Sequence, residues 1–536
     1  MKLSHAVTLA ALALSSPAFA QAPVVTAPSG AVQGVRAGDM RIFKGIPYAV
    51  PPIGAMRWRP PAPLPRWKTV RVATDFGPAC IQPRSKAVSV YSPAEPLPAS
   101  EDCLTLNIWA PANAKKAPVF FWIHGGALTS GSSREAMYDG RRLAEQGVIV
   151  VSINYRLGVL GWLAHPALSL ESPQKVSGNY GLLDQMAALA WVKHNIAAFG
   201  GDPANVTIAG ESAGGLSVMF LMQSPLARGS FAKAIAQSAY MVAIPELKRN
   251  AYGAPSAEAV GQMLAAGVQA PDLAGLRGIE AQTLTDSAAK LGFFPFGVVD
   301  GLVLPEQMVA TFDKGKQAPV PILAGFNQGE IRSLMVLAPK APDSAADYEK
   351  AIRERYGEFA DAFLELYPAS DYKESILATT RDALYGWTSE RLARKQTALG
   401  QPAYLYLFDH GYPAMETAGL HAFHASELPY VFGTFDGTPP RWPKVPESDR
   451  PLSETMMGYW ASFAKNGAAG PGWPAYGKQR NYLHFAETPR ARTGLMPGMY
   501  EHYEAVVCRR RAAGVAWNWN VGLASPKLQP KAAGCE

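Results

Sequence analysis

The chain has 536 residues, of which 48% are hydrophobic and 17% are charged, and its formal net charge is +7. This balance is typical of a globular protein with a large core, and it excludes an intrinsically disordered chain. Basic residues are spread along the sequence without a basic stripe or a nucleic-acid motif, so we expect no nucleic acid as a partner.

The N-terminus has the pattern of a secretory signal peptide. Lys2 precedes an apolar run at residues 6–14, and Ala18-Phe19-Ala20 fits an A-x-A cleavage site. We therefore expect residues 1–20 to be removed and residues 21–536 to form a single catalytic domain. The apolar run is too short to span a bilayer, and no later stretch could. The sequence predicts export, to the periplasm or beyond.

Four cysteines follow the cleavage site, an even number in an oxidising compartment. We predict the disulfides Cys80–Cys103 and Cys508–Cys535. No C-x-x-C or H-E-x-x-H spacing is present, so we expect no metal site.

Apolar runs alternate with helical patterns along the chain. Strands are expected at 118–123, 148–154, 206–209, 320–325 and 404–408. Between 182 and 199 the apolar residues recur at steps of three and four, which predicts a helix, and Asp202-Pro203 predicts a turn after it. Uniformly apolar strands separated by helices indicate an α/β protein with a parallel sheet covered on both faces. In such sheets ligands bind at the carboxyl ends of the strands.

Residues 210–214 read Gly-Glu-Ser-Ala-Gly, which fits the G-x-S-x-G turn between a strand and a helix. The glycines keep side chains out of a tight turn, so Ser212 is a candidate nucleophile. A glycine-rich turn with an unreactive serine is the alternative.

Donors for a developing oxyanion follow the strand expected at 118–123. Gly125, Gly126 and Ala127 form a turn there, and glycine tolerates the dihedral angles that aim N–H groups at an anion. The N–H of Ala213 is a further donor. An ordinary glycine turn is again the alternative.

A serine nucleophile also needs a base and an acid that orients it. His424 follows the strand at 404–408, downstream of Ser212, as the order Ser…acid…His requires. His421 is its rival from position alone. Glu330 follows the strand at 320–324 and is the candidate acid, although most glutamates in loops are simply solvated.

Together these motifs resemble the type-B carboxylesterases, the family that includes the cholinesterases. The resemblance covers about residue 24 to about residue 480, and the blocks that carry it include Glu101-Asp102-Cys103-Leu104, Gly210 to Gly215, Asn179-Tyr180-Gly181 and Glu427-Leu428-Pro429-Tyr430. It implies an α/β-hydrolase fold, with a mostly parallel twisted sheet, helices on both faces and insertions that form a lid or gorge.

The resemblance also implies roles for residues. It implies a triad of Ser212, His424 and Glu330, and it favours His424 over His421 because His424 stands before the Glu-Leu-Pro-Tyr block. It implies oxyanion donors at Gly126, Ala127 and Ala213, with Gly125 adjacent. It supports the Cys80–Cys103 bridge and implies structural ion pairs Arg57–Glu101 and Arg156–Asp184. Glu211 and Ser238 match residues that lie near the catalytic histidine in the family, so we expect them to support it.

Three features depart from the family pattern. Ala127 stands where a third glycine is usual, and Gly329-Glu330-Ile331 replaces Asp-Glu-Gly at the acid. Residues 81–102 contain no tryptophan, so a choline ester is not the expected substrate. Phe293, Phe294 and Phe296 lie where the family builds its acyl pocket; they line a pocket or belong to the core.

We therefore expect an exported serine carboxylic-ester hydrolase that forms an acyl-enzyme on small or elongated organic esters and needs no cofactor. Its partner would be a small-molecule ester. Alternatives are an esterase for polyanionic multi-ester toxins, the same chemistry on an amide, carbamate or polyester, and a non-catalytic cholinesterase-like binding protein. If the pKa of His424 is near that of free imidazole, activity should rise with pH around a midpoint of ~6–7.

Overall fold

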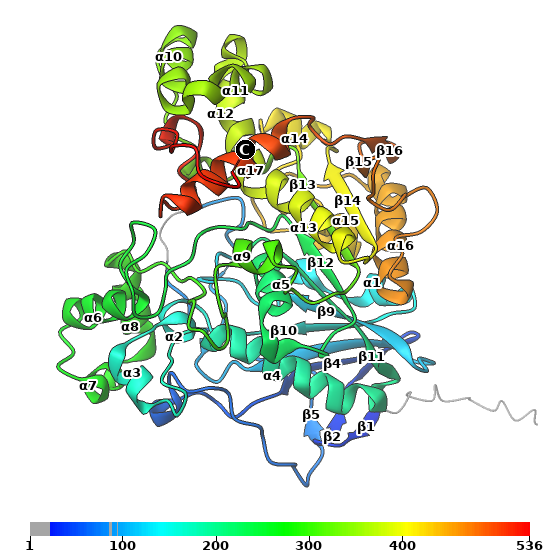
Figure 1. Cartoon of the computed structure of the whole chain (residues 1–536). Coiled ribbons are helices and arrows are strands. Elements are labelled where there is room, and N and C mark those ends of the chain that lie inside the picture. Colours follow the sequence, from blue (N-terminus) through cyan, green and yellow to red (C-terminus); the bar gives the residue numbers. More distant parts are fainter. Residues whose placement is uncertain (1–21, 85–87, 94, 536) are drawn as a thin grey trace, which may run out of the picture.

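The computed structural model describes residues 22–84, 88–93 and 95–535 (Figure 1). The expected signal peptide lies outside these residues. Within them, eleven strands form one sheet, whose spatial order is β16 (Arg490–Thr493), β15 (Asn481–Phe485), β14 (Ala403–Phe408), β13 (Ile322–Asn327), β12 (Lys233–Gln237), β11 (Gly201–Glu211), β9 (Ala117–Ile123), β10 (Ile149–Ile153), β8 (Thr105–Pro111), β4 (Met40–Pro47) and β3 (Val35–Ala37).

The middle of this sheet is parallel and its margins are antiparallel. Every neighbouring pair from β10 to β15 is parallel, whereas β16 and the strands from β8 to β3 pair antiparallel. The mostly parallel sheet expected from the sequence is therefore confirmed. Parallel strands need crossover connections, and helices supply them.

Side chains of the central strands are buried on both faces of the sheet. In β9, Val119, Phe121 and Ile123 belong to one hydrophobic cluster. Phe120 and Trp122, which alternate with them, belong to another. Because successive side chains of a strand point to opposite faces, each cluster fills one side of the sheet. This explains why the strand segments are continuously apolar in sequence.

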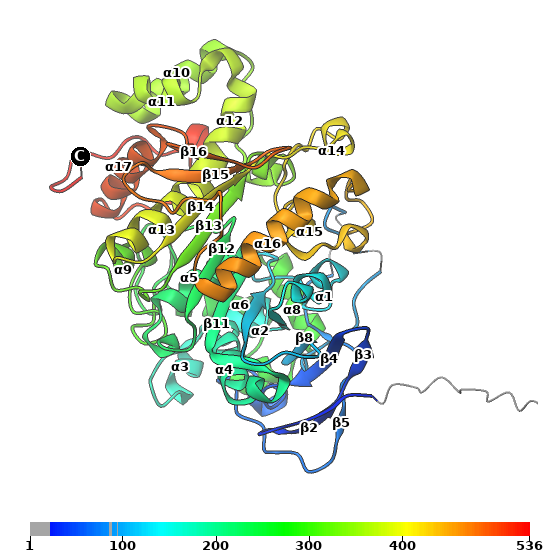
Figure 2. The same cartoon turned by 90° about the vertical axis from the view of Figure 1, so that its right-hand side faces the viewer.

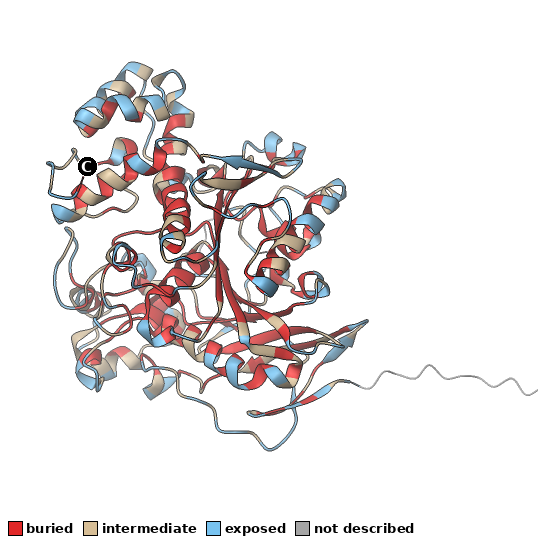
Figure 3. Cartoon of the chain, turned by 45° about the vertical axis from the view of Figure 1, so that its right-hand side comes forward, coloured by how far each residue is buried: buried red, intermediate tan, exposed pale blue. Residues whose placement is uncertain are grey.

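Helices cover both faces (Figure 2). One face carries α1 (Arg141–Glu145), α15 (Leu428–Phe432) and α16 (Arg450–Asn466), and the other carries α4 (Tyr180–Asn195), α5 (Ala213–Gln223), α9 (Met308–Asp313) and α13 (Trp387–Ala398). Figure 3 shows buried residues along the sheet and on the helix surfaces that face it, with exposed residues on the outer surfaces.

The remaining elements lie around this framework. Further helices are α2 (Gly158–Trp162), α3 (Pro166–Glu171), α6 (Ala257–Gly267), α7 (Leu273–Gly278), α8 (Ala281–Lys290) and α14 (Pro413–Thr417). At the top of Figure 1, α10 (Ala345–Tyr356), α11 (Ala360–Leu366) and α12 (Tyr372–Arg381) project beside α17 (Met499–Ala512). Small separate sheets consist of β1 (Val24–Ala27), β2 (Gly30–Gln33) and β5 (Arg71–Val72), and of β6 (Ala79–Cys80) and β7 (Ala99–Ser100).

The strands and the helix expected from the sequence are all present, with one local correction. Asp202 and Pro203 lie inside β11 rather than in a turn before it. The register between β11 and β9 shifts between Gly201 and Val206, so the chain bulges there without leaving the sheet. A bulge accommodates an extra residue and a proline that cannot donate to the ladder.

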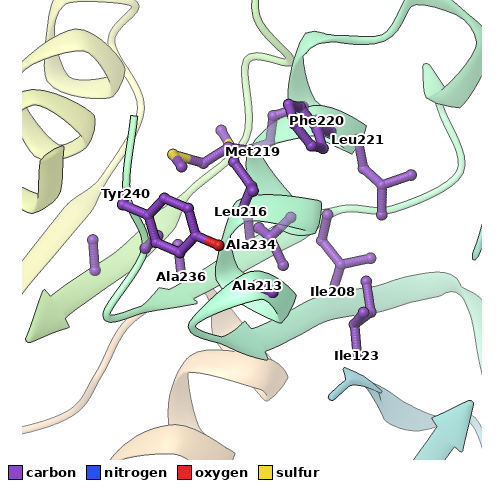
Figure 4. Close-up of a cluster of buried hydrophobic side chains, with 14 of the residues drawn as sticks. Ile123, Ile208, Ala213, Leu216, Met219, Phe220, Leu221, Ala234, Ala236 and Tyr240 are labelled. Atoms are coloured by element: carbon purple, nitrogen blue, oxygen red, sulfur yellow. The ribbon is translucent and has the colours of Figure 1, made fainter. Parts of the chain in front are cut away.

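Helix α5 is anchored in the core directly after β11. Figure 4 shows Ala213, Leu216 and Met219 packed toward Ile208 of β11 and toward Ala234 and Ala236 of β12. All eleven residues of this helix are buried. The start of α5 is therefore held firmly against the carboxyl edge of the sheet. Among the described helices, none is both long enough and apolar enough to cross a membrane.

Candidate active site

Ser212 occupies a sharp turn between β11 and α5. Its φ of 56° and ψ of −122° are strained for a residue with a side chain. A Cβ at Gly210 would lie 2.4 Å from the carbonyl carbon of Gly214, and a Cβ at Gly214 would lie 2.1 Å from the oxygen of Ile123. Only glycine fits both positions. Ser212 is half-buried between two buried neighbours, so the turn presents its side chain at the carboxyl edge of the sheet.

The turn at Gly125, Gly126 and Ala127 lies beside Ser212 because β9 and β11 are adjacent strands. A Cβ at Gly125 would be 3.2 Å from Cβ of Ser212. Gly126 and Ala127 both have positive φ, 100° and 54°. In the described part of the chain, the N–H groups of Gly126 and Ala127 donate no hydrogen bond. The Gly126 carbonyl, by contrast, accepts the backbone N–H of Thr129 and that of Ser130. Two backbone donors are therefore available close to the serine.

His124 and Tyr155 support this turn through hydrogen bonds. The Tyr155 hydroxyl donates to the His124 carbonyl at 2.8 Å, and Nδ1 of His124 lies 2.9 Å from the Gly125 carbonyl. Burial lowers the pKa of His124 to about 4, so its ring is neutral at ordinary pH. His124 and Tyr155 therefore hold the turn in place through neutral hydrogen bonds.

His424 lies between two carboxylates. Its Nδ1 is hydrogen-bonded to Oε2 of Glu330, and its Nε2 lies 3.0 Å from Oε1 of Glu211. Glu211 immediately precedes Ser212 at the end of β11. Among the described residues, the hydrogen bonds include none between the Ser212 hydroxyl and His424. The structure thus brings His424 together with Glu330 and Glu211. Ser212 is adjacent to this cluster because it follows Glu211 directly in the chain.

Glu330 is buried, with 0% of its surface exposed, and is not a solvated loop residue. It begins a short 3-10 helix (Glu330–Arg332) after β13, and its Oε1 accepts the N–H of Asn327 at 2.8 Å. A hydrogen-bond donor on one carboxylate oxygen leaves the other oxygen directed at the imidazole. The departure from the usual Asp-Glu-Gly pattern therefore does not displace this residue.

Glu427 is a buried carboxylate whose role was not predicted from the sequence. Its two oxygens accept from Gln237 Nε2 at 2.8 Å and from Asn327 Nδ2 at 2.7 Å. Asn327 therefore bridges Glu427 and Glu330. The only sequence signal was its place three residues after His424, in a block otherwise recognised for its apolar residues.

Burial and mutual charge shift the pKa values of this cluster. Burial alone would lower the pKa of His424, but the nearby Glu211 and Glu330 carboxylates outweigh it and raise the pKa to about 9. Burial raises the pKa of Glu211 to about 8 and that of Glu427 to about 7. The premise that His424 titrates like free imidazole, which gave a midpoint of ~6–7, does not agree with this environment.

The other sequence-predicted residues lie outside this cluster. His421 is held by Asp409 at 2.7 Å and by Glu416 at 2.5 Å, so both of its ring nitrogens already have carboxylate partners. Ser238 is buried with a φ of 43°, and its hydroxyl has no hydrogen-bond partner within the described ranges. Its backbone N–H donates to Gly325 at 2.8 Å, which anchors the segment after β12.

The covalent and ionic pairs expected from the sequence are present. Disulfides join Cys80 to Cys103 and Cys508 to Cys535. Arg57 pairs with Glu101 and Arg156 with Asp184, each at 2.7 Å.

Phe293, Phe294 and Phe296 line a cavity of about 250 Å³, together with mostly apolar residues such as Trp162 and Tyr252. They therefore line a pocket, and Phe293 and Phe296 also pack against hydrophobic clusters of the core. Phe294 is 47% exposed at the rim of the cavity. Phe296 lies 5.9 Å from the ring of Trp519, which in turn lies 6.5 Å from Tyr240.

Comparisons with known proteins identify similar chains. A family model described as the carboxylesterase family matches residues 21–503. The chain is 38% identical to a fumonisin B1 esterase of Sphingopyxis macrogoltabida, over 87% of each chain. It is 36% identical to a para-nitrobenzyl esterase of Bacillus subtilis (strain 168), over 84% of this chain and 92% of that one. A solved structure of a PNB esterase superposes with a TM-score of 0.78, at 32% identity, over 90% of this chain and 99% of that one. These likenesses confirm the α/β-hydrolase fold.

Proposed function

Because the chain belongs to the carboxylesterase family and is a carboxylic-ester hydrolase, we propose that Ser212, His424 and Glu330 are its catalytic triad. The observation that carries this proposal is the position of the His424 imidazole. One of its nitrogens is hydrogen-bonded to buried Glu330, and the other faces the residue immediately before Ser212. This is the arrangement that a base needs when an acid orients it toward a neighbouring hydroxyl.

In the proposed reaction, Ser212 Oγ attacks the ester carbonyl carbon while Nε2 of His424 takes the hydroxyl proton. The negative charge that develops on the carbonyl oxygen is stabilised by the N–H groups of Gly126, Ala127 and Ala213. His424 then delivers the proton to the departing alcohol, which leaves an acyl group on Ser212. Water attacks this acyl-enzyme by the same steps, and the acid is released.

Glu330 and Glu211 have different proposed roles. Glu330 accepts a hydrogen bond from Nδ1–H of His424 and stabilises the imidazolium that forms during each step. Glu211 lies on the Nε2 side, where burial favours its protonated form. Glu211 and Nε2 can therefore share one proton before the substrate arrives, and the negative charge of the ionised carboxyl group raises the pKa of His424. Ser238 is proposed to support the segment after β12 through its backbone hydrogen bond to Gly325.

The test is replacement of the nucleophile. Ser212→Ala should reduce hydrolysis of p-nitrophenyl acetate by about 10⁴-fold or more, because it removes the oxygen that is proposed to form the acyl-enzyme. Ser448→Ala, at an exposed serine, is the matched control and should keep wild-type turnover. Labelling of Ser212 by an organophosphate, found by peptide mass spectrometry, would identify the attacking oxygen independently. Turnover by Ser212→Ala close to that of wild type would refute the proposal.

We propose small or elongated organic esters as the substrates. None of the proposed catalytic residues lines the apolar cavity of Phe293, Phe294 and Phe296, and we propose that this cavity holds the apolar part of an elongated ester. A second candidate is the polyanionic multi-ester toxin class, which the similarity to the protein named fumonisin B1 esterase favours. A series of p-nitrophenyl esters of increasing chain length, assayed beside fumonisin B1, separates the two by kcat/KM. A non-catalytic binding protein is not proposed, because the relatives named above are esterases.

We also propose that the mature protein starts at Gln21 as one exported catalytic domain. The two disulfides support an oxidising compartment. N-terminal sequencing of the protein secreted or released from the periplasm tests the cleavage site.

A further inference from the structure

The hydroxyl of Tyr91 connects two loops of the active site. Tyr91 lies in the loop closed by the Cys80–Cys103 disulfide. Its Oη donates to the backbone carbonyl of His424 at 2.9 Å and lies 2.6 Å from Oγ of Ser333. A phenol has one proton, so when it is given to the carbonyl, Ser333 is the donor of the second bond. The result is a chain of hydrogen bonds from Ser333 through Tyr91 to the backbone of His424.

These hydrogen bonds join the segment that carries the acid to the segment that carries the base. Ser333 directly follows the 3-10 helix Glu330–Arg332. The distance between the Glu330 carboxylate and the His424 imidazole depends on where these two loops lie relative to each other. Tyr91 belongs to neither of these two loops. Its Oη forms hydrogen bonds to both of them from a third segment, on the side of the His424 backbone.

The ring of Tyr91 is fixed in place for this role. It lies edge-on to the His424 ring at 6.5 Å between centroids and edge-on to Trp442 at 5.9 Å. Burial raises the pKa of Tyr91 well above its ordinary value, so the hydroxyl stays protonated and able to donate wherever the enzyme is active.

We infer that Tyr91 is a positioning residue that holds His424 against Glu330, and that the Cys80–Cys103 loop contributes to turnover through it. The inference rests on the proposed roles of His424 and Glu330. Tyr91 contacts the backbone of His424 and not its imidazole nitrogens, so it acts through the geometry of the base rather than on the substrate.

Loss of the hydroxyl should be visible in two measurements. A small misplacement of a catalytic group lowers the rate, so Tyr91→Phe should lower kcat by roughly three- to tenfold while KM stays nearly constant. It should also move the pH midpoint of kcat/KM to lower pH. Glu211, Glu330 and Glu427 raise the pKa of His424, and a looser contact with Glu330 removes part of that effect. The ring of Tyr385, 5.4 Å from that of His424, is uncharged and does not reverse the direction.

The experiment compares four variants with the wild type on p-nitrophenyl acetate. Tyr91→Phe and Ser333→Ala should each lower kcat and the pH midpoint. The double variant should be little worse than Tyr91→Phe, because both changes break one chain of hydrogen bonds. Tyr459→Phe is the control, since its hydroxyl also donates to a backbone carbonyl, that of Pro471 at 3.2 Å, but in an exposed part of the molecule. It should leave both quantities unchanged.

Two outcomes would overturn the inference. One is wild-type kcat and pH midpoint in Tyr91→Phe. The other is a lower melting temperature without a change in either kinetic quantity, which a merely structural role would produce. If Tyr91→Phe does not fold, Ser333→Ala with an unchanged pH midpoint overturns it equally. Turnover that survives in Ser212→Ala refutes the proposed function itself, whereas Ser212-dependent turnover with normal Tyr91→Phe kinetics refutes only this inference.

Discussion

Nε2 of His424 lies 3.0 Å from Oε1 of Glu211, the residue that leads the chain into Ser212. With Glu330 on Nδ1, the imidazole is in contact with carboxylates on both sides. A base flanked by two buried acids binds its proton more tightly than free imidazole does, and this has a direct consequence for how the enzyme should respond to pH.

We predict that kcat/KM rises with pH and that the midpoint of this rise lies between 6.5 and about 9. The base must be neutral to accept the serine proton, and the surrounding carboxylates raise the pKa of His424 to about 9. Activity is therefore low while the ring is protonated and grows as pH increases through that pKa. Glu211→Gln removes one of the negative charges and should lower the midpoint.

A pH–rate profile of wild type and Glu211→Gln measures both effects. Glu416→Gln is the control, because Glu416 pairs with His421 rather than His424. A wild-type midpoint at or below 6.5, or a midpoint that rises in Glu211→Gln, would contradict this prediction.

Replacement of Glu330 by Gln should lower kcat by roughly 10²- to 10⁴-fold. A neutral amide cannot stabilise the imidazolium, and it can favour the wrong tautomer of the ring. Steady-state kinetics on p-nitrophenyl acetate measures the loss. Glu374→Gln, at a half-exposed carboxylate paired with Arg332, should behave like wild type. A kcat for Glu330→Gln near the wild-type value would mean that another residue orients the base.

Ala127 tests the oxyanion turn. Its φ of 54° lies in the left-handed region, which a β-branched side chain adopts only at a high energetic cost. Ala127→Val should therefore move the backbone N–H and lower kcat by about tenfold or more, whereas Ala127→Gly should keep most activity. Circular dichroism checks that both variants fold. Equal activity of the Val and Gly variants would show that this N–H does not contribute.

Removal of the two disulfides should have different effects on stability and on activity. Cys508 belongs to α17 and pairs with Cys535 near the C-terminus. Replacing both by Ser should lower the free energy of unfolding by about 3 kcal/mol, because the unfolded chain gains entropy, while kcat stays the same. Cys80→Ser with Cys103→Ser should lower kcat as well, since that bridge closes the loop of Tyr91.

Urea unfolding followed by tryptophan fluorescence, with kcat measured on the same samples in the absence of urea, distinguishes these results. A large fall in kcat on loss of the Cys508–Cys535 bridge would be contrary to expectation, as would full activity without the Cys80–Cys103 bridge.

Much of the fold and part of the site could be predicted from local sequence. Strands buried on both faces must be apolar throughout, so β9, β10 and β14 were recognisable from composition alone. The serine turn was recognisable because its sharp geometry admits only glycine at Gly210 and Gly214. Such constraints act between residues that are close in sequence, and they leave a pattern in it.

The partners of His421 and His424 left no comparable pattern. Position after β14 suited both histidines, and only the family resemblance favoured His424. The partners of His424 are far away in the chain, whereas those of His421 are nearby. His421 finds Asp409 and Glu416, whereas His424 meets Glu330 and Glu211. The bridging role of Asn327 between Glu330 and Glu427 was equally invisible.

By itself, then, the amino-acid order determined where strands end and which residues can occupy the tight turns at those ends, because steric limits and alternating burial operate over a few residues. Only the tertiary structure decided which carboxylates meet each histidine, how many of them surround His424 and how far its pKa rises. Those properties depend on the distance and burial of charges that come from separate strands, and these are set when the strands assemble into one sheet.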